Sequence, residues 1–373
     1  MEPENNPVVK YPMDITEPVL LEGFGFTLEA LLDYCATQSK DLSVPQWRRD
    51  VSSFIVLFLD SKNGKIIQKS SGSTGDPKSF TLSREAMCIS AERTLCFFNL
   101  ERGDRALLAL PIHYIAGKMM VVRALLGGLD LVLTEPSSRP LKNLSGAIDF
   151  AAMVPLQIEE SLQGGDSLEQ ISKLIIGGGE LHPSTRKRFA SMVRPEVFET
   201  FGMTETYTHF ALKRINGPDP QSDFKLLEGV KIRLDSRNCL EVEVSGITSG
   251  ALLTNDLVEL NKAGDGFTWQ GRFDNLINSG GIKIIPELLE EQTREAIGHD
   301  CIVLSEPDRK LGMRLVLLVE FEGSGPPINR WLELLRSRLS AYEVPRRVLT
   351  VHTLPRNPSM KPDRTSARRL LLQ

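Results

Sequence analysis

From about residue 50, the sequence alternates short apolar runs with segments whose apolar positions recur every three or four residues. Short apolar runs bounded by turn residues favour buried strands, and the longer spacing favours amphipathic helices. This alternation predicts an α/β fold with a mixed or mainly parallel sheet covered by helices. In such a sheet, active residues lie in loops at strand ends. The expected strands are at 51–60, 104–111, 130–134, 147–155, 171–176 and 195–202, and the expected helices at 83–98, 115–127, the 160s and 184–192.

After about residue 220 the pattern changes to short strands separated by Gly and Asn turns. A polar, glycine-bearing segment at 271–281 then precedes a new series with its own two helices and strands. We therefore expect a large N-terminal domain of mixed sheets layered with helices over residues 1–273. A small α+β C-terminal domain of ordinary size is expected over residues 274–373.

Composition narrows the class of protein. Lys plus Arg number 44 and Asp plus Glu 48, so the net charge of −4 gives no reason to expect a nucleic-acid partner. No stretch approaches the about 18–20 apolar residues of a membrane helix, and the polar start resembles no signal peptide. The five cysteines are scattered and form no CxxC pair, which argues against a zinc site and favours a reducing, cytoplasmic location.

The sharpest local motif is SSGSTGDPKS at 70–79. Its small residues allow close backbone approach and offer N–H and hydroxyl donors to phosphate oxygens, while Lys78 adds a positive charge. A solvent-exposed turn is the alternative interpretation. A Walker loop is disfavoured, because Pro77 takes the last glycine position and has no N–H. The candidate phosphate-binding residues are Ser70, Ser71, Gly72, Ser73, Thr74, Gly75 and Lys78.

The whole segment resembles the phosphate-binding signature of the adenylate-forming superfamily, which includes acyl-CoA synthetases, aryl-CoA ligases, adenylation domains and luciferases. Each further match is weak alone, since a glycine run after a strand is usually a turn, and an N-capping Thr with a Glu in the first helical turn explains 200–205. Their joint occurrence in the family's order is specific. The further matching segments are 177–180, 200–205, 252–257, 271–277, 280–286 and 355–364.

The resemblance implies a role for each matched residue. Mg²⁺ favours hard oxygen ligands, which suits the carboxylate implied for it. The resemblance implies that adenine lies beside Gly178, Gly179, Glu180, Phe201 and Gly202. It implies that the ribose contacts Asp256 and Arg272, the α-phosphate contacts Thr204, and Mg²⁺ binds Glu205. The implied catalytic cations are Lys78 and Lys361.

The resemblance also implies a C-terminal lid that carries Lys361 and swings about Asp274. Gly280, Gly281 and Lys283 would line the channel for the CoA pantetheine. The chain departs from the family pattern at Asn255 and at Met360, where glycine is usual, but neither change removes a charge.

These features predict an ATP-dependent acid–CoA ligase that forms an acyl-adenylate and then a thioester. Its partners would be a small carboxylic acid, ATP and CoA, with Mg²⁺ as cofactor and a homodimer left open. Only 69 residues precede the phosphate loop, fewer than in typical members, and compact members resemble o-succinylbenzoate–CoA ligases of menaquinone biosynthesis.

A second carboxylate on the acid calls for a cationic or donor-rich pocket. Three alternatives stay open: another aryl- or acyl-CoA ligase, an adenylation enzyme that loads a carrier protein, and a degenerate nucleotide-binding homologue. The candidate acid-pocket residues are His113, Tyr114, His209 and Lys213, with Arg214 beside them.

Overall fold

The computed structural model describes residues 15–60, 66–69, 79–356 and 362–371. The chain divides into two compact units, which are described separately. The N-terminal unit comprises residues 1–231 and 243–251, and the C-terminal unit comprises residues 232–242 and 252–373. The predicted functional boundary after residue 273 stays a prediction.

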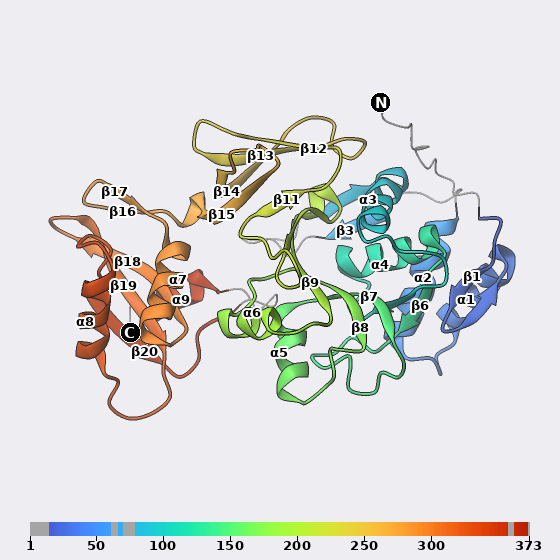
Figure 1. Cartoon of the computed structure of the whole chain (residues 1–373), viewed down its shortest axis with the longest axis horizontal. Coiled ribbons are helices and arrows are strands. Elements are labelled where there is room, and N and C mark those ends of the chain that lie inside the picture. Colours follow the sequence, from blue (N-terminus) through green and yellow to red (C-terminus); the bar gives the residue numbers. More distant parts are fainter. Residues whose placement is uncertain (1–14, 61–65, 70–78, 357–361, 372–373) are drawn as a thin grey trace. The chain divides into compact units, whose positions relative to one another are not determined.

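The N-terminal unit is built on a mixed sheet with a parallel centre (Figure 1). Strands β1, β6, β5, β7, β8 and β9 lie side by side and run parallel. At one end of this series β10 pairs antiparallel with β9, and β11 pairs antiparallel with β10. At the other end β2 pairs antiparallel with β1. The bounds are β1 Val19–Leu21, β2 Phe24–Phe26, β5 Arg105–Leu108, β6 Asp130–Leu133, β7 Ile148–Met153, β8 Ile171–Ile176, β9 Glu196–Gly202, β10 His209–Arg214 and β11 Phe224–Leu226.

Helices cover both faces of this sheet, as the sequence pattern predicts. On β5, Ala106 and Leu108 pack into one core cluster and Leu107 into the other, because successive strand residues point to opposite faces. Helices α1 to α4 contribute to the first cluster, and α5 and α6 to the second. The bounds are α1 Leu28–Lys40, α2 Gln46–Leu59, α3 Arg84–Phe97, α4 Ile115–Gly127, α5 Pro155–Gln163 and α6 Pro183–Ala190.

The prediction of a strand at 51–60 is wrong, since these residues belong to helix α2. Val51, Phe54, Ile55 and Phe58 are buried at the spacing of a helix stripe, while Ser53 is exposed. Val56, Leu57 and Leu59 are also apolar, so residues 54–59 form a continuous apolar run of the kind that predicts a strand. The predicted helix at 83–98 is confirmed as α3, whose N-cap Ser83 accepts from the Ala86 amide.

A separate two-stranded hairpin joins β3 (Ile66–Lys69) to β4 (Ser79–Leu82). Its register pairs Lys69 with Ser79, so the described strands flank the predicted phosphate segment at 70–78 in the sequence.

The described residues of the C-terminal unit form three groups of strands, one of them the antiparallel pair β16 and β17, with three helices. β13, β14 and β15 form an antiparallel group, with β12 beside β13. In the second group β18 is antiparallel to β19, which is parallel to β20. Its bounds are β12 Val230–Leu234, β13 Cys239–Val244, β14 Leu252–Leu260, β15 Gly266–Arg272, β16 Ile277–Ser279, β17 Ile282–Ile284, α7 Pro286–Ile297, β18 Cys301–Asp308, β19 Gly312–Glu320, α8 Ile328–Arg338, β20 Arg347–Val351 and α9 Arg364–Leu370.

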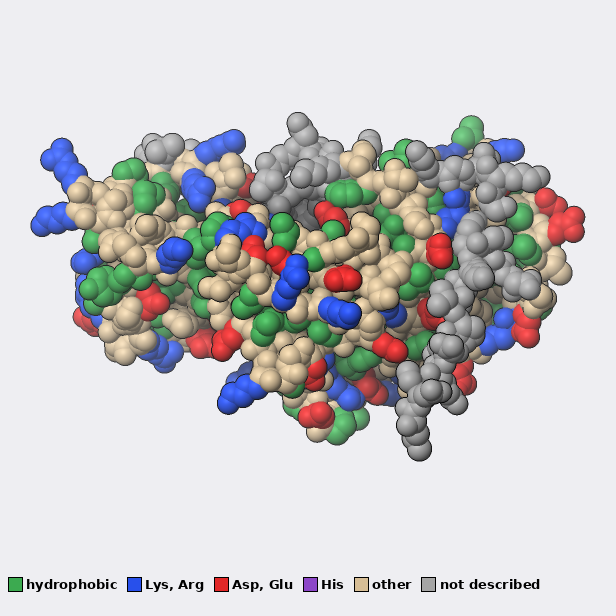
Figure 2. Space-filling view, turned by 90° about the horizontal axis from the view of Figure 1, so that it is seen from above, with side chains coloured by type: hydrophobic (Ala, Val, Ile, Leu, Met, Phe, Trp, Pro, Cys, Tyr) green, Lys and Arg blue, Asp and Glu red, His purple; other side chains and the backbone are tan. Residues whose placement is uncertain are grey.

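Surface charge agrees with the balanced composition. On the face seen in Figure 2, Lys and Arg side chains are interspersed with Asp and Glu, without a broad field of one sign. Within the described residues, no helix is both long enough and apolar enough to cross a membrane.

Candidate active site

Loops at the carboxyl ends of parallel strands hold several of the sequence-predicted residues of the N-terminal unit. Residues 111–114 follow β5, residues 177–180 follow β8, and residues 203–205 follow β9. Because these strands are parallel within one sheet, their carboxyl ends lie along one edge. Segments far apart in the sequence therefore converge at that edge.

The loop after β8 presents bare backbone. The Gly177 amide donates to the carbonyl of Met153, which extends the parallel ladder by one residue. Gly178 has a φ of +83°, a left-handed conformation that favours glycine, and is exposed. Together with Gly179 and Glu180, it forms a loop whose surface suits a flat ring lying on the backbone.

The turn after β9 depends on close backbone approach. A Cβ atom on Gly202 would lie 2.1 Å from the carbonyl oxygen of Thr208, so only glycine fits. The Thr206 hydroxyl donates to that same carbonyl and accepts from the Met203 amide, which fixes the short 3-10 turn Thr204–Thr206. Glu205 projects an exposed carboxylate that pairs with no cation in the described chain.

Behind this turn lies a residue that sequence reasoning missed. Arg123, in the middle of α4, is 1% exposed, and among the described residues no carboxylate pairs with it. Its Nη2 donates weakly to the Thr208 hydroxyl at 3.3 Å and its Nη1 approaches the Met120 sulfur at 3.5 Å, while Nε has no partner. Burial lowers the pKa of Arg123 to about 9, so the guanidinium stays charged at neutral pH.

His209, an acid-pocket candidate, lies close to Arg123. It is buried, and its Nε2 lies 3.3 Å from the Thr94 hydroxyl of α3. Burial and the positive charge of Arg123 hold the pKa of His209 well below its usual range, so the imidazole is neutral at pH 7. The structure thus places a neutral donor or acceptor beside a buried cation.

Lys213 lies on the opposite face of the sheet from His209. A β-bulge between His209 and Ala211 shifts the register and reverses the alternation of β10. Lys213 pairs with the buried Glu199 at 2.7 Å and lies over the Phe224 ring. Phe201 packs edge-on against the same Phe224 ring. The structure therefore does not bring Lys213 and His209 together.

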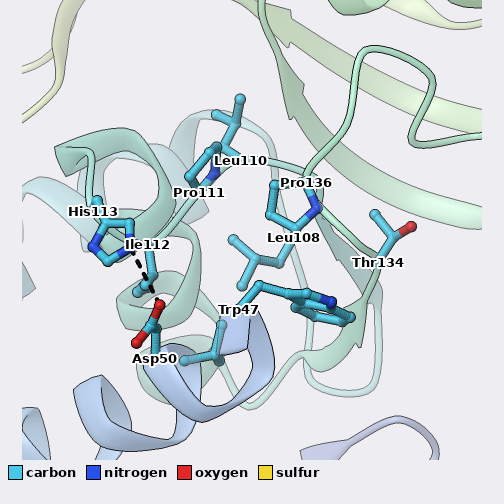
Figure 3. A pocket seen from close by; sticks show the side chains of 10 residues that line it. Trp47, Asp50, Leu108, Leu110, Pro111, Ile112, His113, Thr134 and Pro136 are labelled. Atoms are coloured by element: carbon cyan, nitrogen blue, oxygen red, sulfur yellow. Dashed lines mark ion pairs between the residues drawn. The ribbon is translucent and has the colours of Figure 1, made fainter. Parts of the chain in front are cut away.

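His113 and Tyr114 lie in the turn after β5 and are exposed, and Figure 3 shows the His113 ring turned toward Asp50. The His113 Nε2 lies 3.2 Å from Asp50 of α2. Beside this pair, Trp47, Leu108 and Pro136 line a cavity of about 30 Å³. That volume suits a water molecule rather than an organic acid.

In the C-terminal unit, Asp256 and Arg272 face each other across β14 and β15. Asp256 is 9% exposed; its Oδ1 accepts from Trp269 Nε1 at 3.1 Å and lies 3.5 Å from Arg272 Nη1. The other carboxylate oxygen, Oδ2, is held by no described residue. The protein therefore orients the carboxylate through Oδ1.

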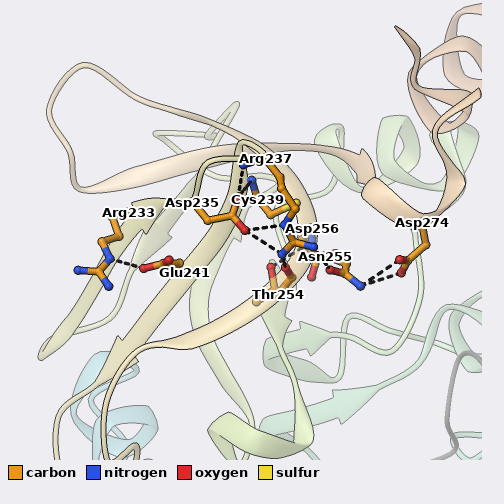
Figure 4. A network of polar contacts seen from close by, with 9 residues as sticks. All are labelled: Arg233, Asp235, Arg237, Cys239, Glu241, Thr254, Asn255, Asp256 and Asp274. Atoms are coloured by element: carbon orange, nitrogen blue, oxygen red, sulfur yellow. Dashed lines mark hydrogen bonds and ion pairs between the residues drawn. The ribbon is translucent and has the colours of Figure 1, made fainter. Parts of the chain in front are cut away.

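Asn255 connects this pair to Asp274 (Figure 4). Its Nδ2 donates to both carboxylate oxygens of Asp274 at 3.0 and 3.1 Å. Arg237 donates to Asn255 Oδ1 at 2.9 Å and so fixes the orientation of the amide. Arg272 Nη2 also contacts Asp274, at 3.0 Å. The asparagine that replaces the family's glycine therefore holds the predicted hinge residue.

Gly280 and Gly281 form the two-residue turn between β16 and β17. Both have positive φ, +62° and +85°, which is the conformation of a tight hairpin turn. Lys283 is exposed on β17. The remaining predicted site residues, Ser70, Ser71, Gly72, Ser73, Thr74, Gly75, Lys78 and Lys361, lie outside the described residues.

Residues 54–244 match the family of AMP-binding enzymes. A probable 2-succinylbenzoate–CoA ligase of Mycobacterium tuberculosis is 27% identical over 326 residues, which span 81% of this chain and 83% of that protein. The 2-succinylbenzoate–CoA ligase of Listeria monocytogenes is 26% identical over 319 residues, 79% of this chain and 68% of that protein.

Solved structures agree. An acyl-CoA synthetase (AMP-forming)/AMP-acid ligase II-like protein from Dyadobacter fermentans is 32% identical, covers 90% of this chain and 97% of its own, and has a TM-score of 0.60. Escherichia coli MenE, at 21% identity, shares the fold with a TM-score of 0.65 over 82% of this chain and 69% of its own.

The fold and the strand-end loops define an adenylate-forming enzyme, an AMP-forming ligase of acids with thiols. The chain belongs to the AMP-binding enzyme family. The family predicted from the ordered motifs and the predicted α/β fold class are therefore confirmed.

We expect Gly202→Ala to weaken ATP binding, because the added Cβ would displace the Thr208 carbonyl and the turn carrying Thr204 and Glu205. Overpacking costs about 1–3 kcal/mol, so ATP affinity measured by calorimetry should fall by about tenfold or more. Gly25→Ala in β2, outside the proposed site, is the matched control, since its Cβ would meet Pro18 at an ordinary 3.6 Å. Equal losses in the two variants would contradict this account of the turn.

Proposed function

We propose that this chain is a 2-succinylbenzoate–CoA ligase. In the first step a carboxylate oxygen attacks the α-phosphorus of ATP, an O–P bond forms, and pyrophosphate leaves. In the second step the CoA sulfur attacks the acyl carbon, a C–S bond forms, AMP leaves, and the thiol proton is released. The named relatives support both the reaction and the acid.

Arg123 is the observation that carries the choice of acid. 2-Succinylbenzoate has two carboxylates, of which only one is activated, so the other needs a partner inside the protein. A fully buried guanidinium without an anion is costly, because burial removes its hydration. A carboxylate of the substrate would supply the missing charge and pair with the unpartnered Nε. Thr208 and neutral His209 provide further polar groups around that carboxylate.

The adenylation step brings two anions together, so charge neutralisation and alignment are its main requirements. In this proposal the segment 70–75 and Lys78 bind the phosphates, and Thr204 contacts the α-phosphate. Lys361 bridges the attacking carboxylate and that phosphate. Adenine lies against the 177–180 loop and Phe201, and the ribose hydroxyls meet Asp256 and Arg272.

Glu205 fits the Mg²⁺ that the family implies. Its carboxylate is an exposed hard-oxygen donor that pairs with no described cation, and it lies beside Thr204 at the strand-end edge. The described residues contain no cluster of three or more metal-ligating side chains. Mg²⁺ usually binds through one or two carboxylates, waters and substrate phosphates, so Glu205 would hold an ion that neutralises the departing pyrophosphate.

Three further predictions belong to the same proposal. CoA would enter beside Gly280, Gly281 and Lys283, and the C-terminal domain would turn about Asp274 between the two steps. The cytoplasmic location stays a prediction from the sequence, and the oligomeric state stays open between a monomer and a homodimer.

The function is tested by AMP release from ATP, Mg²⁺, CoA and a panel of acids. We expect turnover with 2-succinylbenzoate and little with benzoate or fatty acids. Turnover only with one of the latter would contradict the acid but keep the enzyme class. Activity only with a carrier-protein thiol would indicate a carrier-loading enzyme, and no AMP with any acid would favour a degenerate homologue.

Arg123→Met should reduce kcat/KM for 2-succinylbenzoate by about a hundredfold or more, as expected for a lost charge-assisted contact of about 3 kcal/mol. In this variant, kcat/KM should differ less between 2-succinylbenzoate and analogues that lack one of the two carboxylates than it does in the wild type. Because a buried charge is replaced by an apolar side chain, the free energy of unfolding should be unchanged or higher. A structural role would be indicated instead by a lower melting temperature with acid preference unaltered.

Lys361→Ala should abolish adenylate formation, measured as pyrophosphate exchange, because no cation then bridges the two anions. Release of acyl-CoA from a supplied acyl-adenylate should persist, since that step forms no bond to phosphorus. Equal loss of both steps would count against this division of roles.

A further inference from the structure

A second buried cation lies on the same helix as Arg123. Lys118 of α4 is 9% exposed, and its ammonium lies 5.8 Å from the centre of the Phe54 ring of α2. No carboxylate in the described part of the chain pairs with it. A buried ammonium without an anion costs free energy unless oxygen acceptors replace its hydration.

Three such acceptors surround Lys118. Its Nζ donates to Gln68 Oε1 at 2.8 Å, to the Ile112 carbonyl at 2.9 Å and to the His113 carbonyl at 3.3 Å. Gln68 is 2% exposed and donates in turn to the same His113 carbonyl at 2.9 Å. The three N–H groups of the ammonium therefore have three partners, and these come from two separate segments.

The two segments are ones that the reaction would use. Gln68 lies in β3, and the predicted phosphate segment at 70–78 begins two residues later. Ile112 and His113 form the turn after β5, directly before α4. Helix α4 itself carries Arg123, five residues beyond Lys118.

We infer that Lys118 is a positioning residue that holds β3, and with it the origin of the phosphate segment, in register with the helix that carries the acid-binding Arg123. The inference rests on the proposed function for the role of Arg123. Lys118 touches no substrate in this proposal and acts through Gln68. Its charge matters because the neutral amine has one N–H donor fewer than the ammonium, for the same three acceptors.

Burial makes this contact sensitive to pH, because it lowers the pKa of Lys118 to about 8. The charged groups on the neighbouring elements are Asp50 of α2, which pairs with the His113 imidazole, and Arg123 of α4. As the pH rises through about 8, Lys118 loses its proton and one of its three hydrogen bonds to Gln68 and the turn. The hold on β3 should weaken over the same range.

The test compares binding of ATP and AMP to the full chain by calorimetry as a function of pH, which needs no knowledge of the acid. Lys118→Met should weaken ATP binding by about tenfold and leave AMP binding unchanged, since AMP lacks the β- and γ-phosphates. Lys40→Met, at the exposed end of α1, is the control and should alter neither. In the wild type, ATP affinity should fall above a pH of about 8 while AMP affinity holds.

Gln68→Glu is the second variant and keeps the test sharp if Lys118→Met folds poorly. A carboxylate in place of the amide would raise the pKa of Lys118, so the loss of ATP affinity should move to higher pH. A fall at the same pH in Gln68→Glu, or equal losses of ATP and AMP binding in Lys118→Met, would overturn the inference. Failure of the acid panel would instead overturn the proposed acid, and the ATP and AMP measurements would still decide the role of Lys118.

Discussion

Burial of the parallel strands on both faces is the constraint on which the rest of the N-terminal unit depends. Apolar side chains of β5, β7 and β8 fill both core clusters, so a polar side chain in mid-strand loses its hydration and needs a partner within the fold, as Glu199 has in Lys213. Functional groups are therefore restricted to the strand ends and to the helices packed against them. At the ends, Gly178 and Gly202 keep the backbone accessible, and the short turn after β9 presents Thr204 and Glu205.

Helix α4 departs from this separation of apolar core and polar edge, because it buries two cations. Lys118 is satisfied within the fold by three oxygen acceptors. Among the described residues, Arg123 contacts only the Thr208 hydroxyl and a thioether, and none of them pairs with its Nε. The described residues thus compensate the desolvation cost of Lys118 and leave that of Arg123 uncompensated. This difference is the reason for our two proposals, in which Lys118 holds elements of the fold together and Arg123 binds a ligand.

The sequence predicted the α/β alternation and the strand-end loops well, since both follow from local patterns. It failed at 51–60, where apolar residues around a helix stripe read as a strand. Arg123 was missed because no motif contains it, although one arginine within the apolar segment MMVVRALL was a usable signal. His209 and Lys213 were grouped by proximity in the chain, but the bulge in β10 sends them to opposite faces. A register shift of one residue leaves no trace in an alternating pattern.

Asn255 shows how a departure from a motif acquires meaning only in three dimensions. In the sequence it replaces a glycine and removes no charge. In the structure its amide, oriented by Arg237, donates to both oxygens of Asp274, which a glycine cannot do. Arg272 is shared between that carboxylate at 3.0 Å and Asp256 at 3.5 Å. One guanidinium therefore serves both carboxylates, so if Asp274 is the hinge and ligand hydroxyls bind Asp256, as proposed, the conformation of one would be coupled to the occupancy of the other.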